Sequence, residues 1–213
     1  MTNEELNFLY FCQSTNNNLK MFLESQINQP MQSGSIEVIC GSMFSGKTEE
    51  LLRRLKRARF AKLNVEIYKP TIDTRYDIQK VVSHDENHVQ STIVQSASEI
   101  LKLINNPDVV AIDEAQFFTD DLTRVCNNLA SQGIRVIVAG LDMDFLGKPF
   151  GEMPKLLAVA EHVTKVHAIC LDCGSIANHS FRTSEEDSLV ELGETNNYKP
   201  LCRCCFNESL KNA

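Results

Sequence analysis

From residue 36 onwards, segments with the hydrophobic pattern of strands alternate with segments with the hydrophobic pattern of helices. Short apolar runs at residues 36–40, 65–68, 109–112 and 136–139 have the length and the Val and Ile content that are typical of buried strands. Residues 49–62, 97–104 and 120–131 lie between these runs and show helix-like patterns. Strands that alternate with helices predict an α/β fold, in which helices cover both faces of a parallel sheet.

The charge pattern supports the first of these helices. Glu49 and Glu50 lie in its first turn, and Arg57, Arg59 and Lys62 lie near its end, which is the polarity that a helix dipole favours. The basic residues are typical of a solvated helix face, and a nucleic-acid surface is the alternative interpretation. A formal net charge of −7 for the whole chain argues against general affinity for nucleic acid.

A phosphate-binding pattern follows the first apolar run directly. It has the form G-x-x-x-x-G-K-[ST] and consists of Gly41, Ser42, Met43, Phe44, Ser45, Gly46, Lys47 and Thr48. Where a strand leads into such a loop and a helix follows, backbone N–H groups can surround a polyphosphate, the lysine adds a charge, and the threonine hydroxyl can ligate Mg²⁺. The pattern predicts binding of a nucleoside triphosphate, and a glycine-containing turn that binds nothing is the plainer alternative.

Two acidic residues end the third apolar run. Asp113 and Glu114 follow residues 109–112, and in phosphate-loop proteins an Asp at the end of such a strand helps to hold Mg²⁺. A strand end whose acid caps the next helix is the alternative. Because adjacent strand residues point to opposite sides, Glu114 is a candidate general base if Asp113 faces the metal.

Four of the eight cysteines form two C-x₂-C knuckles. Cys170 with Cys173, and Cys202 with Cys205, supply the four thiolates that suit a tetrahedral, structural Zn²⁺ site. Cys204 leaves a second pairing open at the second knuckle, and unligated buried thiols are the plainer alternative. Residues 174–201 separate the knuckles and are long for a plain zinc ribbon, as binding loops and lids often are.

A length of 213 residues fits one α/β domain with a small appendage. We predict a poorly ordered or short-helical extension at residues 1–33, the α/β domain at residues 34–166, and a zinc-binding lid domain at residues 167–213. No apolar run approaches the roughly 20 residues of a membrane-spanning helix. The first residues also lack the pattern of a secretory signal. These features lead us to expect a cytoplasmic protein.

Taken in this order, the motifs resemble those of the type II, zinc-containing thymidine kinases. The matching segments are residues 43–48, 113–118, 140–145 and 148–151, with both knuckles and Tyr198, and the resemblance covers residues 36–206. It implies a phosphate-loop NTPase fold of the RecA-like kind with a small zinc-ribbon or lasso domain. The implied activity is transfer of the γ-phosphate of ATP to the 5′-hydroxyl of thymidine, and also of deoxyuridine, in nucleotide salvage for DNA synthesis.

The resemblance also implies roles for individual residues. Glu114 is the catalytic base, Thr48 and Asp113 serve Mg²⁺, and Ala115 and Gln116 complete the ATP site that residues 41–48, Asp113 and Glu114 form. The implied nucleoside pocket consists of Met43, Phe117, Leu141, Phe145, Phe150, Ser180 and Tyr198. Asp73 and Arg75 match a family segment near the acceptor, and a surface ion pair is the alternative for Arg75.

In the family, the segment between the knuckles folds over the nucleoside, so that zinc would anchor both ends of a lid. Feedback inhibition by dTTP and a homotetramer are further expectations from the resemblance. Three other interpretations predict different features. Another nucleoside kinase would prefer another acceptor, and a nucleic-acid-binding ATPase would carry a basic stripe with aromatic residues. A regulatory GTPase would carry an N-K-x-D segment, which the chain does not contain.

Overall fold

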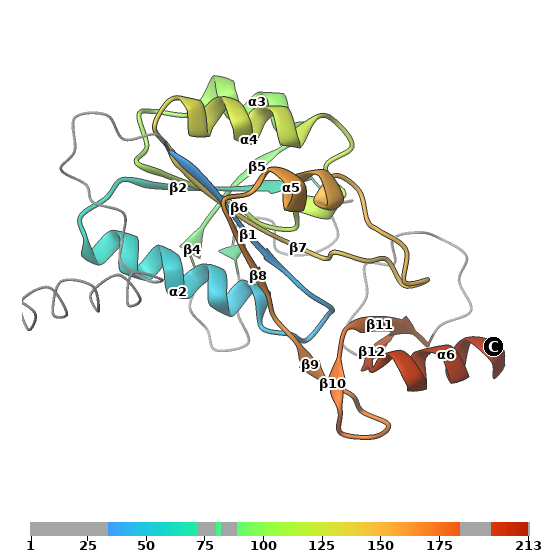
Figure 1. Cartoon of the computed structure of the whole chain (residues 1–213). Helices are drawn as coiled ribbons and strands as arrows, with labels where there is room; N and C mark the ends of the chain where they lie inside the picture. Colours follow the sequence, from blue (N-terminus) through green and yellow to red (C-terminus); the bar gives the residue numbers. More distant parts are fainter. Residues whose placement is uncertain (1–33, 72–79, 82–88, 184–196, 213) are drawn as a thin grey trace, which may run out of the picture. The chain divides into compact units, whose positions relative to one another are not determined.

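Six parallel strands form the central sheet, in the order β5-β2-β6-β7-β1-β8 (Figure 1). The structure is a computed structural model of the 213-residue chain, and it describes residues 34–71, 80–81, 89–183 and 197–212. The strands of the sheet are β1 (Ser35–Cys40), β2 (Val65–Pro70), β5 (Thr92–Val94), β6 (Val109–Ile112), β7 (Arg135–Gly140) and β8 (His162–Lys165). The predicted extension at residues 1–33, and also Asp73 and Arg75, lie outside the described residues.

Helices cover both faces of this sheet. One face carries α2 (Lys47–Phe60), and the other carries α3 (Ala97–Leu103), α4 (Leu122–Ser131) and α5 (Met153–Val159) (Figure 1). Because successive strand side chains point to opposite faces, Val110 and Ile112 of β6 enter one core cluster, whereas Val109 and Ala111 enter the other. The predicted α/β fold, with a parallel sheet between two helical layers, is confirmed.

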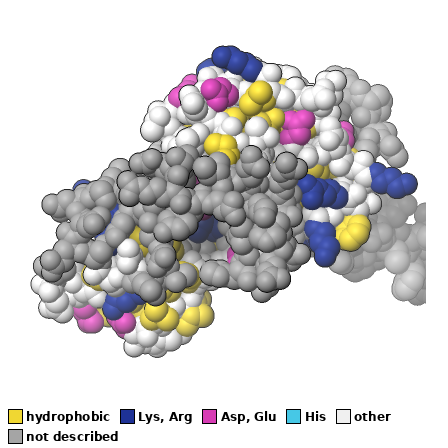
Figure 2. Space-filling model, turned by 180° about the vertical axis from the view of Figure 1, so that it is seen from behind, with side chains coloured by type: hydrophobic (Ala, Val, Ile, Leu, Met, Phe, Trp, Pro, Cys, Tyr) yellow, Lys and Arg dark blue, Asp and Glu magenta, His cyan; other side chains and the backbone are white. Residues whose placement is uncertain are grey.

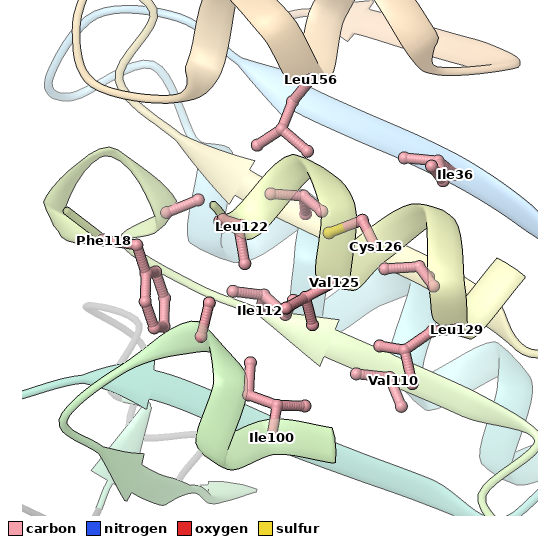
Figure 3. Packing of buried hydrophobic residues seen from close by; sticks show 14 of the residues in the cluster. Ile36, Ile100, Val110, Ile112, Phe118, Leu122, Val125, Cys126, Leu129 and Leu156 are labelled. Carbon is pink, nitrogen blue, oxygen red and sulfur yellow. The ribbon is translucent and has the colours of Figure 1, made fainter. Parts of the chain in front are cut away.

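The larger core cluster lies between the sheet and α3, α4 and α5 (Figure 3). Leu122, Val125, Cys126 and Leu129 recur at helical spacing along α4, and all four are completely buried. Burial of a leucine side chain stabilises the folded state by about 1.5–3 kcal/mol. This repeat therefore holds α4 on the sheet, and with it the chain segment that connects β6 to β7.

The register of the strands brings the candidate motifs to one edge of the sheet. β1 pairs with β7 from Ser35 and Arg135 to Cys40 and Gly140, and β6 pairs with β7 as far as Ile112 and Val138. The phosphate loop, Asp113 and Leu141 therefore each follow the carboxyl end of a strand, and these strands are neighbours. Ligands of open α/β sheets bind at this edge.

All four predicted strands are present, and the sheet contains two more, β5 and β8. The three predicted helices are present as α2, α3 and α4, with ends that differ from the predicted ones by a few residues. No described helix is long and apolar enough to cross a membrane.

The described residues after β8 form short strands and one helix around a small core of their own. β9 (Ala168–Ile169) pairs antiparallel with β10 (Ile176–Ala177), β11 (His179–Arg182) pairs antiparallel with β12 (Tyr198–Leu201), and α6 (Arg203–Asn212) follows. A separate two-stranded ribbon is formed by β3 (Lys80–Val81) and β4 (Val89–Gln90). The predicted domain boundary between residues 166 and 167 stays a prediction.

Candidate active site

The phosphate loop connects the end of β1 to the start of α2. Gly41 has a φ of +150°, and a Cβ atom there would lie 2.2 Å from the carbonyl oxygen of Val166, so only glycine fits. Gly46 is in the left-handed conformation, with φ of +83°, immediately before α2. The N–H groups of the first turn of α2, which contains Lys47 and Thr48, are therefore at the loop, where a helix N-terminus favours anions.

Lys47 brings a partly buried positive charge to this loop. Its Nζ donates a hydrogen bond of 2.7 Å to the carbonyl oxygen of Ser42, which also accepts a bond of 2.7 Å from the hydroxyl of Ser45. Burial lowers the pKa of Lys47, and the carboxylates of Glu114, Asp113 and Asp142 oppose this shift. The ammonium group therefore shares one electrostatic site with three acids that lie far from it in the sequence.

Asp113 follows β6 and is almost completely buried, with an exposed fraction of 3%. Its Oδ1 accepts the backbone N–H of Glu114 at 3.0 Å, and its Oδ2 lies 3.6 Å from Nζ of Lys69. Burial and the neighbouring charge of Glu114 raise the pKa of Asp113 to about 6, against the opposing effect of Lys69 and Lys47. A further positive charge near this carboxylate would favour its ionised form.

Glu114 is held in an unusual backbone conformation. Its φ of 55° and ψ of 39° are left-handed, which a residue with a side chain adopts rarely and at a cost of about 1–3 kcal/mol. The turn leads into the short helix η3 (Ala115–Phe117), in which Ala115 and Gln116 are buried. Oε2 of Glu114 accepts a hydrogen bond of 2.6 Å from Nε2 of Gln116, so the carboxylate has a fixed partner.

Two polar atoms near the loop are buried and have no hydrogen-bond partner among the described residues. These atoms are Oγ of Ser42 and Oδ1 of Asp142, and the other oxygen of Asp142 pairs with Nζ of Lys165 at 2.6 Å. Buried polar atoms normally have a partner, so such atoms mark polar surface that a ligand or a water molecule can satisfy. Both belong to segments at the carboxyl edge of the sheet.

The residues predicted for the nucleoside pocket lie in several contacting groups. Phe117 and Phe150 meet edge to face, with ring centroids 5.7 Å apart. Met43 donates its backbone N–H to Oγ of Ser180 at 2.9 Å, which links the phosphate loop to β11. The six members other than Ser180 are all partly exposed.

The remaining predicted pocket residues contact side chains to which the sequence analysis gives no role. The guanidinium group of Arg182 lies 3.8 Å from the ring centroid of Phe145 and donates to the hydroxyl of Tyr198 at 2.9 Å. Leu141 donates its backbone N–H to Oε1 of Gln116 at 2.9 Å. The contacts of Arg182, in β11, with Tyr198 of β12 and with Phe145 therefore join these two strands to the segment that follows β7.

The four predicted zinc ligands converge. The sulfur atoms of Cys170, Cys173, Cys202 and Cys205 all lie within 4.8 Å of one another. Those of Cys173 and Cys202 are 3.6 Å apart, and four thiolates around Zn²⁺ at about 2.3 Å would be separated by about 3.8 Å. Cys204 lies outside this group, with its sulfur 3.8 Å from Oε1 of Glu208. The donor set and its spacing therefore fit a tetrahedral zinc ion.

Lys69, Asp142 and Arg182 each contact a predicted site residue, although no sequence motif gives them a role. Lys69 is the penultimate residue of β2, which pairs with β6 up to Tyr68 and Ile112. The signal for Lys69 is therefore a lysine at the carboxyl end of a strand that neighbours Asp113. Asp142 lies inside the matched segment 140–145, whereas Arg182 has no signal in the sequence that distinguishes it from other arginines.

Comparison with known proteins gives one consistent result. A family model described as "Thymidine kinase" matches residues 34–206. A thymidine kinase of Bacteroides fragilis (strain YCH46) is 58% identical over 191 residues, which cover 90% of this chain and 96% of the relative. A thymidine kinase of Bacteroides thetaiotaomicron is 59% identical over 186 residues, covering 87% and 94% of the two chains. One from Porphyromonas gingivalis (strain W83) is 58% identical over 186 residues, covering 87% and 91%.

Proposed function

Because this chain belongs to the thymidine kinase family, we infer that it transfers the γ-phosphoryl group of ATP to the 5′-hydroxyl of thymidine. We propose deoxyuridine as a second acceptor, since an apolar and aromatic wall suits a flat pyrimidine with or without a methyl group. The observation that carries the proposal is the placement of the Lys47 loop and of Asp113 and Glu114 after the carboxyl ends of β1 and β6, which both pair with β7. It joins a phosphate-binding charge to an acid that can accept a proton.

Glu114 is the proposed general base. The charge of its carboxylate opposes the lowering of the pKa of Lys47. Gln116 donates a hydrogen bond to one of its oxygens, and the second oxygen would accept the proton of the 5′-hydroxyl. Phosphoryl transfer depends mainly on positioning and on stabilisation of charge, so an ordinary carboxylate suffices if that proton leaves late.

The phosphate loop and Asp113 form the proposed ATP site. The N–H groups at the start of α2 and the ammonium group of Lys47 bind phosphate oxygens. The hydroxyl of Thr48 and the carboxylate of Asp113 are hard oxygen donors of the kind that Mg²⁺ prefers, and both would hold it. When bound, Mg²⁺ supplies positive charge to the phosphates. It would also stabilise the ionised form of Asp113, whose pKa is raised by burial.

Substitution of Glu114 by Gln tests the proposed base. The variant E114Q keeps the size and polarity of the side chain but cannot accept the proton, so we expect kcat to fall by about 10²- to 10⁴-fold. Binding of an ATP analogue, measured by titration calorimetry, should change little. The matched control is E208Q, in an exposed position of α6. Near-normal turnover in E114Q would remove Glu114 from the reaction.

The acceptor is tested by kcat/KM values for thymidine, deoxyuridine and the other common nucleosides, with ATP and Mg²⁺. We expect thymidine and deoxyuridine to lead. A clear preference for a different nucleoside would assign the protein to another nucleoside kinase activity.

A nucleic-acid-binding ATPase is less favoured, because acidic side chains accompany basic ones on the described part of the face that Figure 2 shows.

We propose that zinc at the four-cysteine cluster has a structural role. A closed site of four thiolates has no open position for a substrate, and the cluster joins the two ends of the lid, residues 174–201.

We expect metal analysis of the purified protein to find zinc. The variant C173S should lose the zinc, and its KM for thymidine should rise before its binding of ATP weakens. C204S is the matched control and should keep zinc. A zinc-free active protein would contradict this proposal.

Two further properties are proposed from the resemblance to the type II family. dTTP carries both the base that the pocket would bind and a triphosphate that suits the phosphate loop, so we propose it as a feedback inhibitor. A homotetramer is the proposed assembly. Inhibition kinetics with dTTP and light scattering of the purified protein test these two proposals separately.

A further inference from the structure

The side-chain amide of Gln116 bridges two parts of the site that are far apart in the sequence. Its Nε2 donates to Oε2 of Glu114 at 2.6 Å, and its Oε1 accepts the backbone N–H of Leu141 at 2.9 Å. Glu114 begins the turn after β6, whereas Leu141 directly follows β7. One amide therefore ties the proposed base to the first residue after the neighbouring strand.

The orientation of this amide is fixed by its partners. A backbone N–H can only donate a hydrogen bond, so the oxygen of the amide must face Leu141. The NH₂ group then faces Glu114, and an ionised carboxylate can only accept. A flipped amide would set a donor against a donor and an acceptor against an acceptor. Both hydrogen bonds are satisfied only when Glu114 is the acceptor, and a general base must be able to act as an acceptor before the reaction.

The surroundings leave Gln116 no room to move away. Its exposed fraction is 2%. A Cβ atom on Gly140 would lie 2.9 Å from Oε1 of Gln116, and a Cβ atom on Gly151 would lie 2.4 Å from its carbonyl oxygen. Both glycines thus border the residue closely. Among the residues that the structure describes, the amide of Gln116 is hydrogen-bonded to a carboxylate and to an N–H group, and both belong to the site.

We propose that Gln116 is a positioning residue, which holds the Glu114 carboxylate in the orientation for proton acceptance and couples it to the backbone of Leu141. This rests on the proposed function, in which Glu114 is the base and Leu141 borders the nucleoside. The hydrogen bond occupies one carboxylate oxygen and restricts rotation of the side chain. Leu141 is held at the same time, so the base and one wall of the acceptor pocket have a common anchor.

Two substitutions separate the two hydrogen bonds. Q116L removes both, whereas Q116E in its ionised form keeps an acceptor for Leu141 and sets a like charge against Glu114 in place of the donor. We expect the rate of phosphoryl transfer in a single turnover to fall about 10- to 100-fold in both variants. The KM for thymidine should rise in Q116L and stay within about twofold of the original in Q116E, and the KM for ATP should stay within about twofold in both.

The matched control is Q132L, at a glutamine that is exposed and follows α4; it should leave all three constants unchanged. The folded fraction of each variant is measured by circular dichroism. A transfer rate in Q116L within twofold of the original protein, or a decrease that only follows the folded fraction, would overturn the positioning role. If Q116L does not fold, the transfer rate of Q116E decides by the same criterion.

Failure of this inference is distinguishable from failure of the proposed function. If the original protein does not phosphorylate thymidine, or if E114Q is fully active, the assignment of the base is wrong and the role of Gln116 falls with it. If thymidine is phosphorylated and E114Q is inactive while Q116L transfers at the normal rate, only the inference about Gln116 is wrong.

Discussion

Asp113 and Glu114 are neighbours in the chain, yet their carboxylates have different surroundings. Asp113 is buried beside Lys69, and burial raises its pKa to about 6, whereas Glu114 is partly exposed and hydrogen-bonded to Gln116. One dipeptide therefore supplies two different acids, because burial and hydrogen-bond partners differ at its two positions.

The two glycines of the phosphate loop differ in how much space a Cβ atom would have. A Cβ atom on Gly41 would meet the carbonyl oxygen of Val166, which directly follows β8, whereas a Cβ atom on Gly46 would have 3.7 Å of space to Glu49. We expect G41A to lower the free energy of unfolding by about 3 kcal/mol or more, since the backbone must shift. G46A should cost only about 1–2 kcal/mol, for its left-handed conformation. Chemical denaturation without ligands measures both, and equal costs would contradict the proposed clash.

The sequence predicts the residue types of this site better than the contacts between them. The phosphate pattern, the acids after β6 and the knuckle cysteines are recognisable because each keeps a fixed local spacing. The bond between Gln116 and Leu141 spans residues whose proximity depends on the pairing of β6 with β7. No local pattern records that pairing, so the role of the glutamine amide becomes visible only in three dimensions.

At the level of elements, a buried ion-pair network ties the sheet to α2. Glu37 of β1 accepts from Arg54 of α2 at 2.7 Å and from Arg135 of β7 at 2.6 Å, and Arg54 also donates to Thr164 of β8 at 2.8 Å. Burial by itself would raise the pKa of Glu37, but the two arginines outweigh it and the pKa is lowered. Four elements are therefore joined around one carboxylate.

We expect E37Q to lower the free energy of unfolding by about 3 kcal/mol at neutral pH, because Arg54 and Arg135 lose a buried charged partner. Since the folded pKa of Glu37 lies below its ordinary value of 4.5, its ionisation stabilises the fold fully above that value. The contribution is lost as the pH falls through the lower folded pKa. Denaturation curves at several pH values should therefore show the two proteins converging in acid.

The control for this prediction is K155Q. Lys155 pairs with Glu152 at 2.6 Å, but its side chain is 67% exposed. An exposed pair contributes little to stability because solvent screens it, so this variant should be nearly as stable as the original at every pH. A pH-independent effect of E37Q would show that lost packing, rather than lost charge, is responsible.

Strands with a mixed pattern are the elements that sequence analysis misses. β8 lies at the sheet edge and consists of His162, Val163, Thr164 and Lys165, mostly exposed, so it has no apolar run to reveal it. β5 is three residues long and occupies the other edge. The central strands β1, β6 and β7 are covered on both faces and must be apolar, which is why their positions can be predicted.

In the molecule as a whole, the proposed ATP site and the proposed nucleoside lid touch directly. The hydroxyl of Ser180 in β11 accepts the backbone N–H of Met43 in the phosphate loop at 2.9 Å. A ligand that orders either segment should therefore favour the arrangement of the other. The same contact could not be predicted from sequence, since its two residues are 137 positions apart in the chain.

We expect a non-hydrolysable ATP analogue to tighten thymidine binding in the original protein, and S180A to reduce that factor towards one, because the direct polar link is removed. Couplings of this kind are typically about 5- to 150-fold. Titration calorimetry with thymidine, in the presence and absence of the analogue, measures the factor, and thermodynamic linkage requires the same factor when the analogue is titrated instead. C204S, at an exposed thiol beside the cysteine cluster, should keep the original coupling. An unchanged factor in S180A would mean that the two sites communicate by another route.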